Sequence, residues 1–447
     1  MIKSISLILI SLSLLHSQNI EQTIQEVLTT NPAVLERVYN YKTTKQDVTA
    51  AQSGYYPTLD IKLSGGLEQT AKTGPNGNDI SLVDDGEYNV YQASLTYKQN
   101  LFNGFQTLYQ VESQEYKSVS SAYSYIQKAN SIAFETVNTY LQVIKNQELL
   151  ITAQANVDIN KQILVKVQKL FNAGLTTLSE VHKIESSLFL AKSNLVVQEN
   201  TILDVSYNLQ KVLGRELDPK EMIRPTLNIS FPPTLEETIS FSLEHNPSLL
   251  VSDYNIKLAQ ATQEEKKSAF YPLVDIEVSQ AMNENLNGIK GTDDRFRAMA
   301  YVSYNLFNGF ADDAALQKSQ SKVYQQQMNK DTIKREIIEN LNRAWAANNK
   351  LKEQLKYLVK YKEFSNKTLK LYSKEYDLGR RSLLDLLSAQ NDFIQSKAQI
   401  IITEYSLLYA KYRILDAMGI LVLSTISDTQ EIYSNVDLVT DELNKGL

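Results

Sequence analysis

The chain lacks cysteine and has few helix-breaking residues, with 9 Pro and 15 Gly among 447 residues. The absence of cysteine excludes disulfides, thiolate zinc sites, iron–sulfur clusters, cysteine nucleophiles and a lipidated N-terminal cysteine. Only 3 histidines are present, which leaves little material for a His-rich metal or acid–base site. The scarcity of Gly and Pro favours long helices. The net charge of −6 argues against a nucleic-acid partner.

Signatures of enzymes are missing as well. The sequence contains no phosphate-binding loop, dinucleotide fingerprint or nucleophile elbow. His182 and Glu185 have a spacing that suits a metal, but a metal ion needs further ligands. We therefore expect no enzyme activity, no cofactor and no metal, so that any energy the function requires comes from a partner.

Long apolar runs are also missing after the N-terminus. Lys3 precedes an apolar stretch from Ile5 to Leu15, and the sequence then turns polar. This pattern predicts a secretory signal peptide at residues 1–17, with an uncleaved anchor as the alternative. No later run reaches the roughly 18 apolar residues of a transmembrane helix.

What the chain does contain is one unit written twice. The doubled elements are Asn31-Pro32 with Asn246-Pro247, Tyr56-Pro57 with Tyr271-Pro272, and the Leu-Phe-Asn-Gly-Phe run at 101–105 with its copy at 306–310. Matches that share a register over this length indicate an internal repeat. We expect a first repeat at 18–214, a Pro-rich connector at 215–233, a second repeat at 234–419 and an acidic tail at 420–447 that is a surface strap or a frayed end.

Gly and Pro interrupt both copies at matching positions. Runs without either residue cover 105–173 and 310–378, and shorter ones follow at 175–213 and 380–418. At about 1.5 Å per residue, each longer run would form a helix on the order of 100 Å. Apolar residues recur in these runs at a coiled-coil-like spacing. Helices this long cannot form a compact globule, and we expect them to pack side by side as hairpins.

Between the helices the pattern has period two. Leu59, Ile61 and Leu63 alternate with polar residues, and residues 296–304 alternate in the same way. The stretches 65–86 and 283–294 are rich in Gly, Asn and Asp and are predicted loops. Each copy thus supplies one strand hairpin, and the chain supplies four strands. Four strands cannot close a membrane barrel, so strands that span a membrane would require several chains to share one.

These features together resemble the TolC outer-membrane efflux family. The resemblance lies in the signal peptide, the doubled Asn-Pro, Tyr-Pro-x-x-Asp and Leu-Phe-Asn-Gly-Phe elements, and the paired helices broken by Gly174 and Gly379. It covers nearly all of the mature chain. It implies a mixed α and β membrane protein that assembles as a homotrimer, with a twelve-stranded β-barrel among outer-membrane lipids and an α-helical periplasmic tunnel.

The resemblance also implies a function. It suggests a passive export duct of a tripartite efflux or type I secretion system, engaged by a periplasmic adaptor protein and an inner-membrane pump of the RND or ABC class. Drug efflux and protein secretion both remain open. A structural periplasmic coiled-coil or tethering protein is the competing class, which the strands with aromatic ends disfavour.

The two helix turns carry matching chemistry. Gly174 and Gly379 suit left-handed helix C-caps. Thr177 with Glu180, and Ser382 with Asp385, each have the spacing of a capping box that opens the next helix. From the residues alone, helix capping is therefore the simpler interpretation of both carboxylates.

The resemblance adds a gate at these turns. It implies that Tyr376 and Arg381 bond to the first-repeat hairpin around Ser179 and Glu180. It matches Asp385 to the first of two acidic residues that narrow the channel, while Ser388 stands at the second. Adaptor contacts are implied for the exposed turn residues Leu175, Arg380 and Leu383, beside Gly174 and Gly379. The remaining doubled positions are expected to be structural, where helices and strands meet: Pro57, Pro272, Asn103, Gly104, Asn308 and Gly309.

Overall fold

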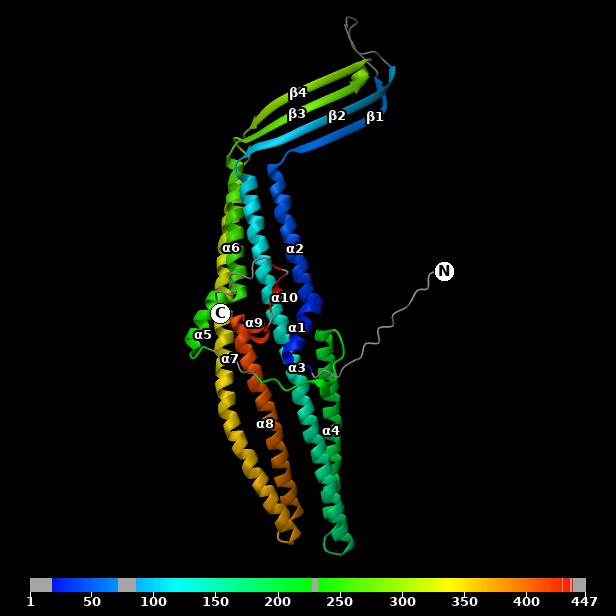
Figure 1. Cartoon of the computed structure of the whole chain (residues 1–447), viewed down its shortest axis with the longest axis vertical. Coiled ribbons are helices and arrows are strands. Elements are labelled where there is room, and N and C mark those ends of the chain that lie inside the picture. The colour runs from blue at the N-terminus through cyan, green and yellow to red at the C-terminus, as the bar shows by residue number, and fades with distance from the viewer. Residues whose placement is uncertain (1–17, 71–85, 227–231, 428, 435, 437–447) are drawn as a thin grey trace, which may run out of the picture. The chain divides into compact units, whose positions relative to one another are not determined.

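The computed structural model describes residues 18–70, 86–226, 232–427, 429–434 and 436 (Figure 1). The expected signal peptide at 1–17, most of the first predicted loop and the end of the tail lie outside these residues. Two compact units divide the chain. One contains the described residues up to Tyr39, Ala122–Leu250 and those from Thr332 onward, and the other contains Asn40–Ser121 and Val251–Asp331.

The two halves of the chain contain the same elements in the same order. The first half has the helices α1 (Ile20–Thr30), α2 (Pro32–Gln52), α3 (Gln106–Asn172) and α4 (Leu178–Leu213), with strands β1 (Thr58–Thr70) and β2 (Gly86–Asn103) between α2 and α3. The second half has α5 (Leu235–His245), α6 (Pro247–Lys266), α7 (Ala311–Asp377) and α8 (Leu383–Met418), with β3 (Leu273–Glu284) and β4 (Thr292–Ser303). Both α3 and α7 have 67 residues, and both α4 and α8 have 36. The predicted long helices are therefore confirmed to within a few residues.

Four antiparallel strands form one sheet in the order β1-β2-β3-β4, as Figure 1 shows. The prediction of four strands is confirmed for the described residues. The predicted loops were too long, because β1 continues to Thr70 and β3 to Glu284, with β4 beginning at Thr292. The Gly and Asn residues of these stretches tolerate strand conformation where the neighbouring strand supplies hydrogen bonds.

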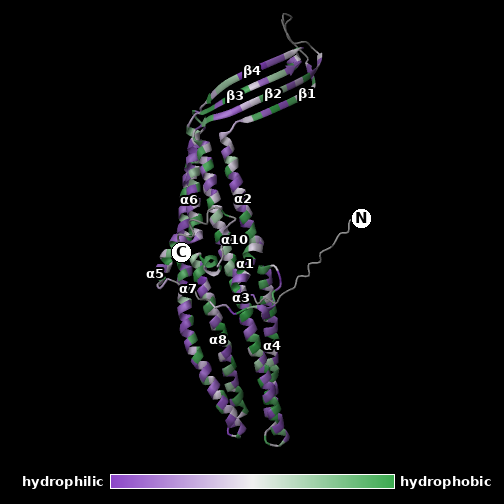
Figure 2. Ribbon diagram, viewed as in Figure 1, coloured by the Kyte–Doolittle hydropathy of each residue, from purple (hydrophilic) through white to green (hydrophobic). Residues whose placement is uncertain are grey.

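The register gives the sheet one apolar and one polar face. Directly paired residues share a face. On one face, Ile61 pairs with Leu95 in one row, and Val278 pairs with both Tyr97 and Ala298 in the next. The other face is mostly polar, with pairs such as Asp60–Thr96, Lys98–Glu277 and Ser279–Arg297. Figure 2 shows the resulting alternation of hydrophobic and hydrophilic residues along the strands.

Helix-to-strand junctions explain the doubled Tyr-Pro elements. Pro57 directly precedes β1, and Pro272 directly precedes β3, which confirms their predicted position. Proline cannot continue the preceding helix and biases its neighbour to extended backbone.

The first Leu-Phe-Asn-Gly-Phe copy joins β2 to α3. Asn103 ends β2, and its side-chain amide donates to the Thr107 hydroxyl at 2.7 Å. Gly104 has φ +63, and a Cβ there would lie 2.7 Å from the Ser268 carbonyl oxygen and from Tyr271 Cβ. This position therefore requires glycine for both its backbone angle and its close packing.

The second copy departs from the prediction that Asn-Gly ends a strand. β4 stops at Ser303, five residues before Asn308, whose amide donates to Asp312 at 3.2 Å. Gly309 has φ +57, but nothing lies within 4 Å of its Cβ position. β2 stays paired with β3 up to Asn103, whereas β4 pairs with β3 only up to Ser303, because β3 begins at Leu273.

Clusters of buried apolar residues join the helices of the hairpins. One cluster near the turns joins α3, α4, α7 and α8 through Val167, Ile184, Tyr376 and Leu387. Another joins α6, α7 and α8 through Leu249, Leu341 and Ile414. No helix among the described residues is both long and apolar enough to cross a membrane. Figure 2 shows hydrophilic residues interspersed along every long helix.

The tail is partly packed rather than frayed where it is described. Two short helices, α9 (Leu421–Thr425) and α10 (Gln430–Tyr433), follow α8. The buried Tyr125 hydroxyl of α3 donates to the carbonyl oxygen of Ile432 at 2.5 Å. This contact supports the strap interpretation for the described part of the tail.

Candidate functional site

The turns at the ends of α3 and α7 have the same backbone. Gly174 and Gly379 have φ +72 and +68. In the first turn, the Leu175 amide donates to the Leu170 carbonyl at 2.8 Å, and in the second the Arg380 amide donates to the Glu375 carbonyl at 2.8 Å. These bonds define Schellman caps and confirm the predicted left-handed glycines.

The helices that follow the turns are capped differently. The Ser382 hydroxyl accepts from the Asp385 amide at 3.2 Å and donates to the Asp385 carboxylate at 2.8 Å. Ser382 therefore caps α8 as predicted, although the carboxylate bonds to the hydroxyl rather than to the Ser382 amide.

The predicted capping box at Thr177 and Glu180 is wrong. Thr177 occupies the N-cap of α4 but makes no side-chain cap hydrogen bond. Its hydroxyl lies 2.8 Å from that of Ser179, and the Glu180 carboxylate accepts instead from the Thr176 hydroxyl. Thr177 thus interacts with Ser179, and Glu180 with Thr176, instead of with each other's backbone as a capping box requires.

The gate residues make other contacts than expected within the chain. Arg381 donates through Nε to Glu375 Oε2 at 2.8 Å, and its guanidinium lies 4.2 Å from the Tyr372 ring centroid. Arg381 therefore bonds inside its own hairpin and not to Ser179 or Glu180. The reason is that Glu375 lies in the last turn of α7, six residues before Arg381, within reach of the guanidinium.

Tyr376 meets the first-repeat hairpin through apolar contacts. Its ring is buried among Val167, Val181 and Ile184. Among the described residues its hydroxyl has no hydrogen-bond partner. Burial raises the pKa of Tyr376, and the Glu180 carboxylate raises it further. The Tyr376 hydroxyl is thus protonated, can donate a hydrogen bond and lies near the Glu180 carboxylate.

Charge links the two hairpins at a place that the sequence analysis missed. The Lys166 ammonium of α3 donates to the Asp377 carboxylate of α7 and lies 5.7 Å from the Tyr376 ring centroid. Both residues precede their turn glycines. Their opposite charges were the only signal in the sequence, and opposite charges are common on helix surfaces.

The turn residues divide into exposed and buried ones. Leu175 is 74% exposed, and Arg380 is also exposed. The expectation that Leu383 is exposed is wrong, because it is only 1% exposed and packs with Leu386 and Tyr376. Leu383 is the first residue of α8, and the helix rotates it towards the hairpin seam while Leu384 faces outward.

The α8 face that carries Asp385 contains a further acid. Asp385 is half-buried, Ser388 is exposed, and Asp392 is exposed one turn beyond Ser388. Positions three and four apart lie on one helix face. Asp392 was not singled out in the sequence because it stands seven residues from Asp385 rather than three.

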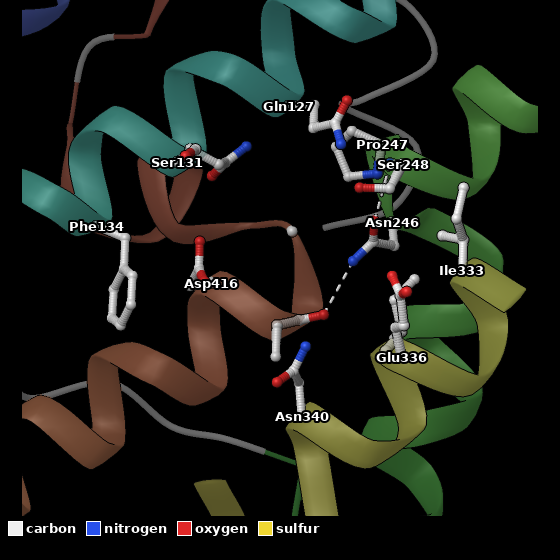
Figure 3. A pocket seen from close by; sticks show the side chains of 14 residues that line it. Gln127, Ser131, Phe134, Asn246, Pro247, Ser248, Ile333, Glu336, Asn340 and Asp416 are labelled. Carbon is white, nitrogen blue, oxygen red and sulfur yellow. Dashed lines mark hydrogen bonds between the residues drawn. The ribbon is translucent and has the colours of Figure 1, made fainter. Parts of the chain in front are cut away.

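A polar hollow lies at the far end of α8, between α3, α7 and the α5–α6 junction (Figure 3). The Asn246 amide donates to the Ala417 carbonyl at 2.9 Å, and its side-chain oxygen accepts from the Ser248 amide at 2.9 Å. Asn31 repeats this pattern on the Val212 carbonyl at 3.0 Å. The doubled Asn-Pro elements therefore join the end of one long helix to the start of another.

Asp416 faces this hollow, and Figure 3 shows it near Phe134, Ser131 and Asn340. Burial raises the pKa of Asp416 to about 7, opposed in part by the charge of Arg413. A carboxyl group with this pKa changes charge near neutrality.

Comparison with known proteins gives a consistent picture. The model of the family described as "Outer membrane efflux protein" matches residues 23–215 and 238–420. The chain is 21% identical to the outer membrane efflux protein BepC of Brucella suis over 326 residues, covering 72% of this chain and 70% of that one. It is 19% identical to the outer membrane protein TolC of Escherichia coli over 426 residues, covering 92% and 84%.

Solved structures resemble the fold. The CmeC outer membrane channel of Campylobacter jejuni has a TM-score of 0.81 at 14% sequence identity, covering 94% of this chain and 90% of that one. CusC, whose structures describe transmembrane channel formation, has a TM-score of 0.79 at 14% identity and covers 90% and 92%.

Proposed function

The chain belongs to the outer membrane efflux protein family, and from this premise we propose how it works as an outer-membrane export channel. The proposal is a passive duct formed by a homotrimer, with a shared β-barrel and a periplasmic helical tunnel, opened by an adaptor and an inner-membrane pump. The two repeats, 18–214 and 234–419, each supply one strand hairpin and one helix hairpin to it.

The observation that carries the proposal is the two-faced, open-edged sheet. Its strands have 12 to 18 residues, which exceeds the roughly 9–11 that a tilted membrane strand needs. The edge strands β1 and β4 have unpaired backbone groups, which lipid does not tolerate. Three copies joined edge to edge would remove every free edge. The apolar face would then meet lipid, and the polar face would line the lumen.

Two neighbouring residues of β4 test the assignment of the faces. Ala298 lies on the apolar face and Met299 on the polar one. Arg on the lipid-facing side of a barrel costs about 2–4 kcal/mol near the midplane, whereas lumen positions tolerate charge. We expect Ala298→Arg to reduce the amount of protein that resists carbonate extraction from outer membranes, and Met299→Arg to leave it unchanged. Release of the unaltered protein by carbonate would instead favour a periplasmic tether.

The acidic face of α8 supports a cation-sensitive constriction. A trimer would bring together three copies of Asp385 and three of Asp392, with Ser388 between them. Close carboxylates repel one another and attract cations. With Ser388 in place of a second nearby acid, we expect weaker cation binding than in a channel with two acids three residues apart.

The exposed turns are the proposed adaptor contacts. Leu175 and Arg380 are exposed on turns whose backbone is fixed by Gly174 and Gly379. Because the chain has no cysteine, Arg380→Cys offers a single site for a short cross-linker in cells. Capture of an adaptor would support docking here, and the pump that accompanies it would distinguish drug efflux from protein secretion. Efficient labelling that yields only self-cross-links would contradict docking at this turn.

A further inference from the structure

The connector between the repeats is fixed to α3 immediately before Arg224. The buried Tyr140 hydroxyl accepts from the Ile223 amide at 3.0 Å and lies 2.8 Å from the carbonyl oxygens of Gln18 and Ile223. Gln18 and Met222 also form a parallel β-bridge. The backbone that carries Arg224 is therefore held to the first-repeat hairpin.

From this anchored point, Arg224 reaches the second-repeat hairpin. Its Nη2 donates to Glu404 Oε2 of α8 at 2.6 Å, and its Nη1 lies 3.6 Å from Glu148 Oε1 of α3. The guanidinium lies 5.2 Å from the ring centroid of Tyr405, whose hydroxyl donates to Glu148 at 2.6 Å. We name these four residues the connector clasp: Arg224, Glu148, Glu404 and Tyr405.

The charges of the clasp make Arg224 its essential member. One guanidinium lies between two half-buried carboxylates, Glu148 on α3 and Glu404 on α8. Without Arg224, two like charges would face each other across the seam between the hairpins. Repulsion would then replace attraction at this point.

The clasp lies on α8 between two regions where this helix or its hairpin contacts the first-repeat hairpin. Beyond it, Tyr409 stacks on Phe134 at 5.2 Å, and Tyr412 and Leu415 are buried. Towards the turn, the hairpins are connected by the Gln390 amide donating to Asn156 at 3.0 Å, by the Lys166–Asp377 ion pair and by the cluster around Tyr376. The clasp therefore restrains α8 between these two regions, and a displacement at the clasp can be transmitted along α8 to the turns.

We propose that Arg224 is a positioning residue for the periplasmic gate: it holds α8 against α3 and so sets the resting position of the α7–α8 hairpin. The inference rests on the proposed function for its consequence, which is gating. It assigns a role to the inter-repeat connector that is separate from the contacts at the turn itself.

Arg215 provides a matched control within the same connector. Its side chain is 47% exposed, as is that of Arg224, and it pairs with Glu26 at 2.6 Å. This ion pair joins the connector to α1, beside a hydrogen bond from Arg215 to the Gln18 side chain at 2.8 Å, and touches neither α7 nor α8. Arg215→Gln thus removes a comparable ion pair without releasing the seam.

The test measures the distance between the two turns in the full-length protein. Spin labels at Leu175→Cys and Arg380→Cys, in chains diluted with unlabelled protein, report the separation of the hairpins by electron paramagnetic resonance. We expect Arg224→Gln to lengthen and broaden this distance and to raise ion conductance in planar bilayers. Arg215→Gln should give the same distance as the unaltered background. Arg224→Lys keeps the positive charge and should lengthen the distance less than Arg224→Gln.

A second variant distinguishes repulsion from general damage. Adding Glu148→Gln to Arg224→Gln removes one of the two facing carboxylates while keeping an acceptor for Tyr405, so the distance should return towards that of the unaltered protein. Arg224→Gln that matches Arg215→Gln in the distance measurement would overturn the clasp. If the unaltered protein itself conducts no ions, the proposed channel function fails, while the distance measurement still decides the clasp.

Discussion

The two helix turns share a backbone and differ in how side chains hold it. Gly174 and Gly379 form the same cap after helices of equal length. Yet Ser382 caps α8, whereas Thr177 leaves α4 without a side-chain cap. The duplication thus preserved the positions where the chain must turn, and the side chains diverged between the copies.

The long helices of the two copies differ even more. α3 buries residues along much of its length, including Ile126, Val137 and Tyr140, while α7 exposes large side chains such as Tyr357 and Phe364. In the single chain, α7 has fewer neighbours to cover it. In the proposed trimer, adjacent copies would cover these side chains. The second-repeat hairpin would then be held by contacts between copies, which can be released.

The largest expected difference between the copies concerns Asp416, whose place in the first copy is taken by Lys211. Because burial raises the pKa of Asp416 in the folded state from 3.8 to about 7, the protonated form is favoured on folding. Its contribution to stability is complete below about pH 4 and is lost as the pH rises towards 7. We expect Asp416→Asn to raise the free energy of unfolding at pH 8 by about 2–4 kcal/mol and to change it little at pH 4.

Denaturant unfolding at both pH values checks this expectation. Equal effects of Asp416→Asn at pH 4 and pH 8 would contradict the assigned pKa.

The glycines that end α4 and α8 give the next contrast. Gly214 and Gly419 have φ +82 and +79, so alanine costs about 1 kcal/mol at either from backbone strain. At Gly419 a Cβ would also collide with Pro247 Cδ and lie 3.3 Å from Asn246 Cα, whereas nothing lies within 4 Å at Gly214. We expect Gly419→Ala to lower the free energy of unfolding by about 1–3 kcal/mol more than Gly214→Ala. Similar losses of thermal stability in the two variants would contradict this expectation and would show that the Asn246-Pro247 junction can move to accommodate the added Cβ.

The caps of α4 and α8 provide a smaller contrast. Ser382→Ala removes a hydroxyl that accepts from the Asp385 amide, and we expect it to cost about 1 kcal/mol. Thr177→Ala removes no cap hydrogen bond and should cost only a few tenths of that. Amide hydrogen exchange at the first turns of α4 and α8 would measure both changes, and equal acceleration would contradict the assignment of the caps.

The smallest expected change concerns cation block. Asp385→Asn would remove three carboxylates from the proposed constriction and leave three from Asp392. We expect divalent cations to block the open channel of Asp385→Asn less tightly. Combining Asp385→Asn with Asp392→Asn should weaken this block further. Unchanged block in Asp385→Asn would exclude Asp385 from the cation site.

The sequence was most informative where a residue type leaves one conformational choice. The scarcity of Gly and Pro marked the long helices, Gly174 and Gly379 marked their turns, and alternation marked the strands. These are local properties of the chain, so they can be read without knowing which segments meet.

The side-chain partners could not be predicted in the same way. Leu383 is buried because α8 is rotated so that this residue faces the other helices. Arg381 binds Glu375 of its own hairpin and not the facing hairpin. Lys166 with Asp377, and Arg224 with Glu404, join residues far apart in the chain. Such pairs depend on how helices rotate against each other, and ordinary surface charges offer many alternatives.

The most direct test of the account is the conductance of the purified full-length protein in a planar lipid bilayer. We expect ion-conducting events of uniform size and of low conductance, because the gate rests closed. Met299→Arg on the polar sheet face should change the ion selectivity of these events. Protein that inserts or associates without any conductance would contradict the export channel and favour a tethering role.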